Sequence, residues 1–264
     1  MPFKPLLIFS ILLSFSCNNP TGAAGGDEHN KVNAPRNASS KNTYHHIAEI
    51  TLPKGYQRVK ADNNSFAEWL RSISLKENKT VYLYNGSPKL NQQAQFAVMD
   101  ISTGNKNLQQ CADAVMRLRA EYLFAQQQYG NIVFTDNEQT QYRFTAPYSY
   151  THFTSYLQQV FGMCGSASLS KQLKPVDTFS SIMPGDVLIR GGFPGHAAIV
   201  MDVAADNSGN KIFLLAQSYM PAQDIHVLVN PLNDTLSPWY STNAETQKIH
   251  TPEYLFYKTE LKQW

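Results

Sequence analysis

The segment from residue 183 to residue 203 constrains the fold more than any other part of the chain. Its sequence is MPGDVLIRGGFPGHAAIVMDV. The Pro-Gly-Asp triplet predicts a turn, the apolar residues after it predict a buried strand, and the glycines and proline that follow exclude a helix. His196 then opens a second apolar run, which predicts a second core strand. The histidine lies at the start of that strand, behind Gly195, which permits close approach of a backbone or a substrate. His196 is therefore a candidate catalytic base; the alternative is a buried structural histidine that closes the hairpin.

The strongest helical pattern covers residues 107–128. Apolar residues recur there every three or four positions and form one stripe that includes Cys111. Asn107 is predicted to cap this helix. A thiol in the first turn lies near the positive end of the helix dipole, which favours the thiolate. Cys111 is therefore a candidate nucleophile; the alternative is a small core residue, because free cysteines are commonly buried.

The motif PGDVLIRGG…GHAAIVMDV resembles the histidine-bearing hairpin of papain-like cell-wall hydrolases, the NlpC-type peptidases and CHAP amidases. The chain also resembles a family of bacterial lipoproteins of uncharacterised function, in the blocks LQQCADAVMRLRAEYL and LLAQSYMPAQDIH. The hydrolase resemblance covers residues 108–229. It implies an α+β fold with a papain-like core, in which the helix that bears Cys111 packs on an antiparallel sheet. It also implies Cys–His hydrolysis. Cys111 and His196 are 85 residues apart, farther than in compact members of these families, so we expect an insertion at about 130–180.

A cysteine hydrolase needs a group that holds its histidine in the useful tautomer. Gln217 ends the expected return strand, where the resembled families place Asn, Gln, Glu or His; the alternative is an ordinary polar residue at a strand end. Asp202 is six residues along the strand from His196, about 20 Å away at ~3.3 Å per residue, so distance excludes it. The Cys111 N–H and Gln110 are the candidate oxyanion hole.

Cys164 is the second thiol that could carry chemistry. It is followed by Gly-Ser-Ala, which matches part of the papain signature. Three interpretations are open: a nucleophile, a disulfide with Cys111 in an oxidising compartment, or an inert thiol. The resemblance assigns it no role, and if Cys111 attacks, we expect Cys164 to lie elsewhere and unpaired.

Three residues in later loops are further candidates for substrate contact: Asp224, His226 and Trp239. The first two could instead bond to their own loop backbone. The chain carries no metal-binding, phosphate-binding or dinucleotide motif, so we expect no metal and no cofactor. The net charge is +2 without a basic stripe, which makes nucleic acid an unexpected partner.

The first residues predict export. The apolar run from Leu6 to Phe15 is too short to span a bilayer and is typical of a signal peptide over residues 1–16. Cys17 then resembles a lipoprotein processing site; the alternative is a signal peptide without lipidation. We expect the mature protein to be a monomer in the cell envelope, anchored through a lipid on Cys17 at the periplasmic or outer-membrane face.

The rest of the chain predicts one domain on a tether. Residues 17–46 are polar and small, so they cannot bury enough surface to fold. Residues 47–264 are long enough for a single α+β domain, with an N-terminal extension over 47–106 and a catalytic-like core over 107–264. Within the extension, residues 48–52, 81–84 and 96–101 are predicted to be strands.

Two functions follow from these observations. The first is a cysteine hydrolase that cleaves an amide or peptide bond, with peptidoglycan or another peptide as substrate. The second is a non-catalytic envelope protein that binds a peptide or glycan in the same cleft. Exposure discriminates between them, because a catalytic Cys111 must open to a groove beside His196.

Overall fold

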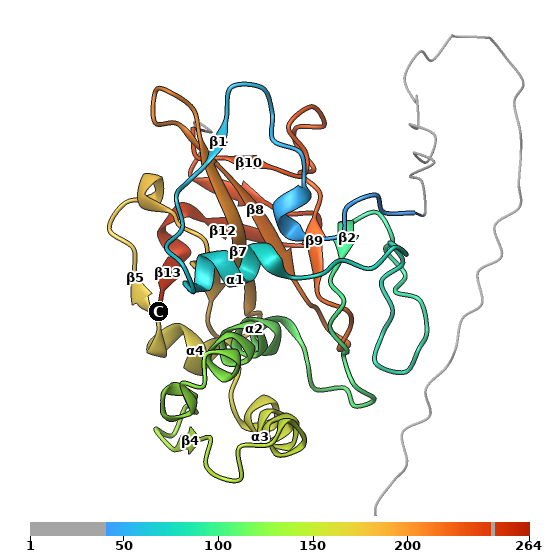
Figure 1. The fold of residues 1–264 in the computed structure, drawn as a ribbon, viewed down its shortest axis with the longest axis vertical. Helices are drawn as coiled ribbons and strands as arrows, with labels where there is room; N and C mark the ends of the chain where they lie inside the picture. The colour runs from blue at the N-terminus through green and yellow to red at the C-terminus, as the bar shows by residue number, and fades with distance from the viewer. Residues whose placement is uncertain (1–40, 244–245) are drawn as a thin grey trace, which may run out of the picture. The chain divides into compact units, whose positions relative to one another are not determined.

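A nine-stranded antiparallel sheet forms the centre of the fold (Figure 1). This computed structural model describes residues 41–243 and 246–264, so Cys17, the expected signal peptide and most of the expected tether lie outside the described residues. The main path of the sheet runs β2-β9-β8-β7-β6-β13-β5, with β1 paired to β7 and β10 paired to β8. Its strands are β1 (Gln57–Arg58), β2 (Gln95–Val98), β5 (Lys174–Pro175), β6 (Val187–Arg190), β7 (His196–Ala205), β8 (Lys211–Gln217), β9 (His226–Leu228), β10 (Tyr240–Ser241) and β13 (Leu261–Gln263).

Four α-helices accompany the sheet in the described residues, which confirms a mixed α+β class. They are α1 (Phe66–Ser72), α2 (Cys111–Ala125), α3 (Tyr150–Met163) and α4 (Ser166–Gln172). Two small hairpins complete the fold, β3 (Val133–Thr135) with β4 (Gln141–Arg143), and β11 (Lys248–His250) with β12 (Leu255–Tyr257). In Figure 1, α2, α3 and α4 gather below the sheet and α1 crosses in front of it. Of these helices, both α2 and α1 pack directly on β7.

The central strand β7 is buried on both faces, as its apolar sequence predicts. Residues on opposite faces belong to two separate cores: Ile199 lies in the core on the helix side, and Val200 lies in the core on the other side. A register shift between Val200 and Asp202, opposite β8, changes this alternation, so that Val203 faces the same core as Val200. The irregularity occurs next to Asp202, the one charged residue of the strand.

The helix that bears the candidate nucleophile begins later than predicted. Its N-cap is Gln110, whose backbone N–H donates to Asp113 Oδ2 at 2.9 Å. The predicted cap, Asn107, instead accepts a hydrogen bond from the backbone N–H of Ala222 at 2.7 Å, so its side chain is used between loops. As a result Cys111 is the first residue of α2, closer to the helix terminus than the sequence pattern indicated.

Part of the N-terminal region departs from the strand pattern read in the sequence. The expected strand over 48–52 is replaced by a 3-10 turn, Ile47–Glu49, because Ile47 and Ile50 are both buried and stand three residues apart. The expected strand over 81–84 makes only isolated bridges, since its backbone turns back at Ser87. Yet β1 and β2 pair with β7 and β9, so residues 47–106 are part of the same sheet.

Candidate active site

The start of α2 and the start of β7 meet at one groove of about 340 Å³. Cys111, partly exposed, and His196, 2% exposed, both line it. The other lining residues come from the first turn of α2 and the segment before it, the end of α3, the start of α4, the β6–β7 loop, and the residues that follow β8 and β11. Gln110 and Gly195, two weaker candidates from the sequence, also lie on this groove.

Gly195 is required because three backbone or side-chain groups crowd it. A Cβ added to Gly195 would overlap Gly192 O and Ser166 Oγ and would press on Arg190 O. The β6–β7 loop therefore folds tightly against the N-terminus of α4. This close approach fixes where His196 enters β7.

The His196 ring is held by one hydrogen bond and three aromatic rings. Its Nε2 lies 2.7 Å from Gln217 Oε1, at the end of β8. The rings of Tyr219, Tyr254 and Phe256 lie with centroids 4.7, 4.8 and 5.7 Å away. Its other nitrogen, Nδ1, has no hydrogen-bond partner among the described residues. Burial lowers the pKa of His196 to about 4, so the ring is neutral near pH 7.

The electrostatics of Cys111 differ from those expected of a thiol at a helix start. Burial raises the pKa of the Cys111 thiol, and Asp113 raises it further. The backbone N–H groups of Ala112, Ala197 and Cys111 itself lower it less. The resting pair is therefore a neutral thiol and a neutral imidazole. Because Ala197 directly follows His196, its contact with the sulfur places the thiol against the first residues of β7.

Asp113 is a groove residue that the sequence analysis did not single out. Its side chain is buried, and its Oδ1 has no hydrogen-bond partner in the described part of the chain. Burial raises its pKa to about 8, and the backbone N–H of Gln110 lowers it less. The sequence did contain a signal, because an acidic residue three positions after an N-cap commonly bonds the cap backbone.

Cys164 lies on the same groove, contrary to the expectation that it would lie elsewhere. It is the C-cap residue of α3, just before α4 begins. Both it and Cys111 are free thiols, so the disulfide interpretation does not describe this structure. Burial raises the pKa of Cys164 to about 11, with Asp136 and Asp113 adding to the effect. Cys164 therefore forms very little thiolate near pH 7.

Comparison with protein families identifies the chain by its sequence. The model of the family described as "Domain of unknown function (4846)" matches residues 47–148 and 135–263. The chain belongs to this family. Neither the curated proteins nor the solved structures contain a match. The family description names no reaction, so any function for this family member has to be argued from the groove itself.

Asp202 lies far from the chemistry of the groove and is fully used by two arginines. Its Oδ2 is 2.6 Å from Arg58 Nε and its Oδ1 is 2.7 Å from Arg71 Nε. The carboxylate is completely buried and also accepts the backbone N–H of Val203 at 2.8 Å. Its role is to join β7 to β1 and α1, which agrees with the distance argument made from the sequence.

The structure does not bring the three candidates from the later loops to the groove. Asp224 is buried and pairs with Lys76 at 3.0 Å. His226 is fully buried, with Nδ1 2.9 Å from the Asp224 carbonyl oxygen. Trp239 is 1% exposed and donates from Nε1 to Thr51 O at 2.9 Å. Asp224 and Trp239 are structural where they stand, because their polar atoms bond the protein. His226 is also sealed away from the groove, although its buried Nε2 has no hydrogen-bond partner among the described residues.

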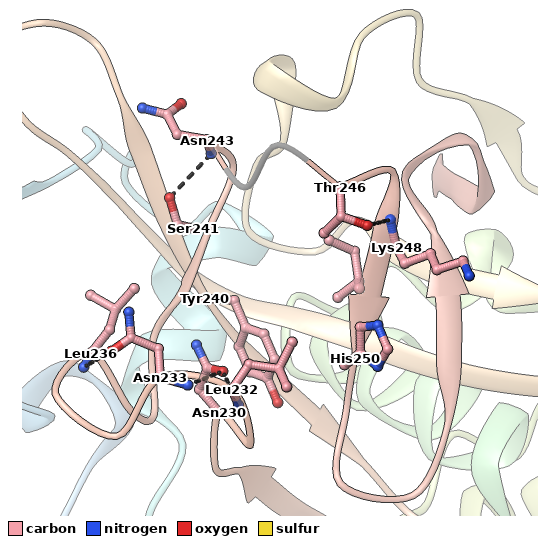
Figure 2. Close-up of a pocket in the computed structure, with 11 residues that line it drawn as sticks. Asn230, Leu232, Asn233, Leu236, Tyr240, Ser241, Asn243, Thr246, Lys248 and His250 are labelled. Carbon is pink, nitrogen blue, oxygen red and sulfur yellow. Dashed lines mark hydrogen bonds between the residues drawn. The ribbon is translucent and has the colours of Figure 1, made fainter.

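A second hollow lies between the loop 230–243 and the β11–β12 hairpin (Figure 2). Its volume is about 350 Å³. The side chains of Asn230 and Asn233 accept backbone N–H groups of their own loop, and Thr246 accepts the N–H of Lys248. These polar groups stabilise turns, and no cysteine is among the described residues that line the hollow. The groove at Cys111 is therefore the better candidate site.

The described residues hold neither a cluster of metal ligands nor a membrane-spanning helix. Over 41–243 and 246–264, no group of three or more His, Cys, Asp or Glu side chains could hold a metal ion. In the same ranges, no helix has both the length and the apolar character needed to cross a bilayer.

Proposed function

We propose that this chain is a lipid-anchored cysteine hydrolase with a papain-like core, which cleaves an amide or peptide bond, in cell-wall peptide or a similar substrate. One observation carries the proposal: Cys111 at the first residue of α2 and His196 at the first residue of β7 line one groove, with Gln217 bonded to the far nitrogen of the ring. These are the parts of an activated nucleophile: a thiol, a base, and a group that orients the base.

In the proposed reaction, Nδ1 of His196 accepts the thiol proton as the Cys111 sulfur attacks the carbonyl carbon. The oxyanion that forms lies at the N-terminus of α2, near the Cys111 N–H and Gln110. The C–N bond breaks, the amine takes the proton from His196 and leaves, and a thioester remains. A water molecule, deprotonated by His196, then hydrolyses the thioester and restores the thiol.

Because Cys111 and His196 are both neutral at rest, their protonation states determine when the proton is transferred in the proposed reaction. Because burial raises the pKa of Cys111 and lowers that of His196, proton transfer accompanies attack instead of preceding it. The same raised pKa of Cys111 favours the second candidate function, an envelope protein that binds a peptide or glycan in the groove without cleaving it.

Thiol labelling discriminates between these two functions. An iodoacetamide probe is applied to the folded protein from pH 5 to pH 9, with Cys111→Ala and Cys164→Ala as a matched pair. We expect fast labelling to be lost in Cys111→Ala and to change little in Cys164→Ala. In His196→Ala, which retains Cys111, we expect Cys111 to be labelled more slowly than in the wild type. If His196→Ala leaves the labelling of Cys111 unchanged, the pair does not act together and the binding function is the better account.

The membrane anchor is tested separately. If Cys17 carries the lipid, Cys17→Ala releases the protein from the membrane fraction, because this one residue holds the attachment. Cys164→Ala is the control, since it also removes one thiol. Retention of Cys17→Ala in the membrane fraction would contradict the lipid anchor without affecting the hydrolase proposal.

A further inference from the structure

Behind the proposed catalytic pair, a chain of hydrogen bonds leads from His196 to the partly buried carboxylate of Glu253. Gln217 accepts at Oε1 from the ring and donates from Nε2 to Glu253 Oε2 at 2.9 Å. Glu253 Oε2 is also 2.6 Å from Lys89 Nζ, and its Oε1 accepts from Asn91 Nδ2 at 3.1 Å. Glu253 precedes β12 in sequence and belongs to none of the motifs that identify the groove.

This arrangement determines which way the Gln217 amide points. Taken alone, the two ends of an amide are nearly equivalent, so a glutamine beside a histidine can present either oxygen or nitrogen. Glu253 removes this freedom, because an ionised carboxylate only accepts hydrogen bonds and must face the nitrogen of Gln217. The oxygen of Gln217 therefore faces His196, whose Nε2 must then carry a proton.

We propose that Glu253 is a positioning residue that acts through Gln217 to hold His196 in the tautomer protonated at Nε2, with Nδ1 free to accept the thiol proton. This inference rests on the proposed function for its consequence, since a base at Nδ1 matters only if Cys111 attacks. The effect of Glu253 on the orientation of Gln217 and on the tautomer of His196 does not depend on the reaction of Cys111.

Glu253 has a second effect, on the charge of the ring. Burial lowers the pKa of His196, whereas the bond to Gln217 and the charge of Glu253 raise it, and Lys89 lowers it. A neutral glutamine can orient an imidazolium but cannot offset its charge, so Glu253 supplies the negative charge from one residue farther away. The titratable groups that face His196 are Glu253, Lys89, His226, Tyr219, Tyr254 and Cys111.

The test observes the tautomer directly, by ¹⁵N NMR of the His196 ring in the folded full chain. In the wild type we expect a protonated Nε2 and an unprotonated Nδ1. Glu253→Gln keeps an acceptor for Gln217 but removes the charge, so we expect the same tautomer and a downward shift of the His196 pKa. The double variant Glu253→Leu with Lys89→Met removes the acceptor and its cation together, so that no buried charge is left unpaired. There we expect a mixture that includes the Nδ1-protonated tautomer, and alkylation of Cys111 at pH 7 slower by about tenfold or more.

Glu121→Gln is the matched control, because Glu121 is as buried as Glu253, at 15% and 14% side-chain exposure, and is likewise paired with one cation, Arg117, at 2.7 Å. It should change neither the tautomer nor the pKa of His196. An unchanged tautomer in the double variant would overturn the proposal. If the double variant does not fold, the same tautomer measurement on Glu253→Leu alone decides, and an unchanged tautomer there overturns the proposal. Absence of Cys111 reactivity in the wild type would count against the hydrolase proposal alone, since the NMR result does not depend on it.

Discussion

The two ends of β7 each bury a titratable side chain, yet they are built for opposite purposes. At one end the Asp202 carboxylate is sealed, with both oxygens bonded to arginines. At the other end His196 is equally buried, but only Nε2 is bonded and Nδ1 remains without a partner among the described residues. Burial alone therefore does not mark a functional residue in this fold. A better indicator of a functional residue is a buried polar side chain that borders a groove and has one polar atom without a hydrogen-bond partner.

The largest effect on stability should come from substitution of Asp202, whose carboxylate is fully hydrogen-bonded. Asp202→Asn removes the charge between Arg58 and Arg71, and we expect the free energy of unfolding to fall by roughly 3 kcal/mol, because two cations then share one neutral side chain. Urea denaturation measures the loss. The rate of Cys111 alkylation per folded molecule should stay unchanged, and a large fall in that rate would contradict the separation of the two ends.

A smaller effect on stability, but a larger one on reactivity, is expected at the open end. Gln217→Ala removes the only side-chain hydrogen bond to His196 among the described residues, so the ring loses its preferred tautomer and orientation. We expect Cys111 alkylation at pH 7 to slow by roughly 10- to 100-fold while the fold persists, as judged by circular dichroism. If Gln217→Ala left the rate of Cys111 alkylation unchanged and Asp202→Asn lowered it strongly, the comparison would be reversed.

The smallest expected effect is a pH dependence of the unfolding free energy that comes from Asp113. It extends the comparison to a third buried titratable side chain. Its pKa is about 8 in the fold, far above its unfolded value of 3.8, so between these values unfolding releases a proton and stability falls as pH rises. Asp113→Asn removes this term. We expect the difference in unfolding free energy between variant and wild type to grow by about 1 kcal/mol from pH 7 to pH 8.

Asp186→Asn is the control for that measurement. The pKa of Asp186 is raised by burial only to about 6, so its own contribution is nearly constant above pH 7. A difference that grows equally in both variants would show that Asp113 is not the source of the pH dependence.

Part of this organisation could be predicted from the sequence, because it depends on local pattern. The turn, strand and glycine loop before His196 follow from neighbouring residues, as does the helix of Cys111, although its cap moved from Asn107 to Gln110. The pairing of Gln217 with His196 could be read from two adjacent strands.

Other features could not be predicted, because they depend on segments that are distant in the sequence. Glu253 reaches Gln217 from beyond three further strands, β9, β10 and β11, and no local pattern connects it to β8. The arginines that neutralise Asp202 come from residues 58 and 71, more than 130 positions earlier. At 48–52, burial of Ile47 and Ile50 at a spacing of three overrode a sequence that reads as a strand.

The distance along the chain between α2 and β7 has a consequence for the order of folding. The β6–β7–β8 meander joins neighbours in sequence and can form early, because its loops are short to close. Cys111 joins it only after the 84 residues between Cys111 and His196 are arranged, and β13 must still pair with β6. In an unfolded chain Cys111 is thus far from His196, and the proposed catalytic pair is assembled late, when the domain is nearly complete.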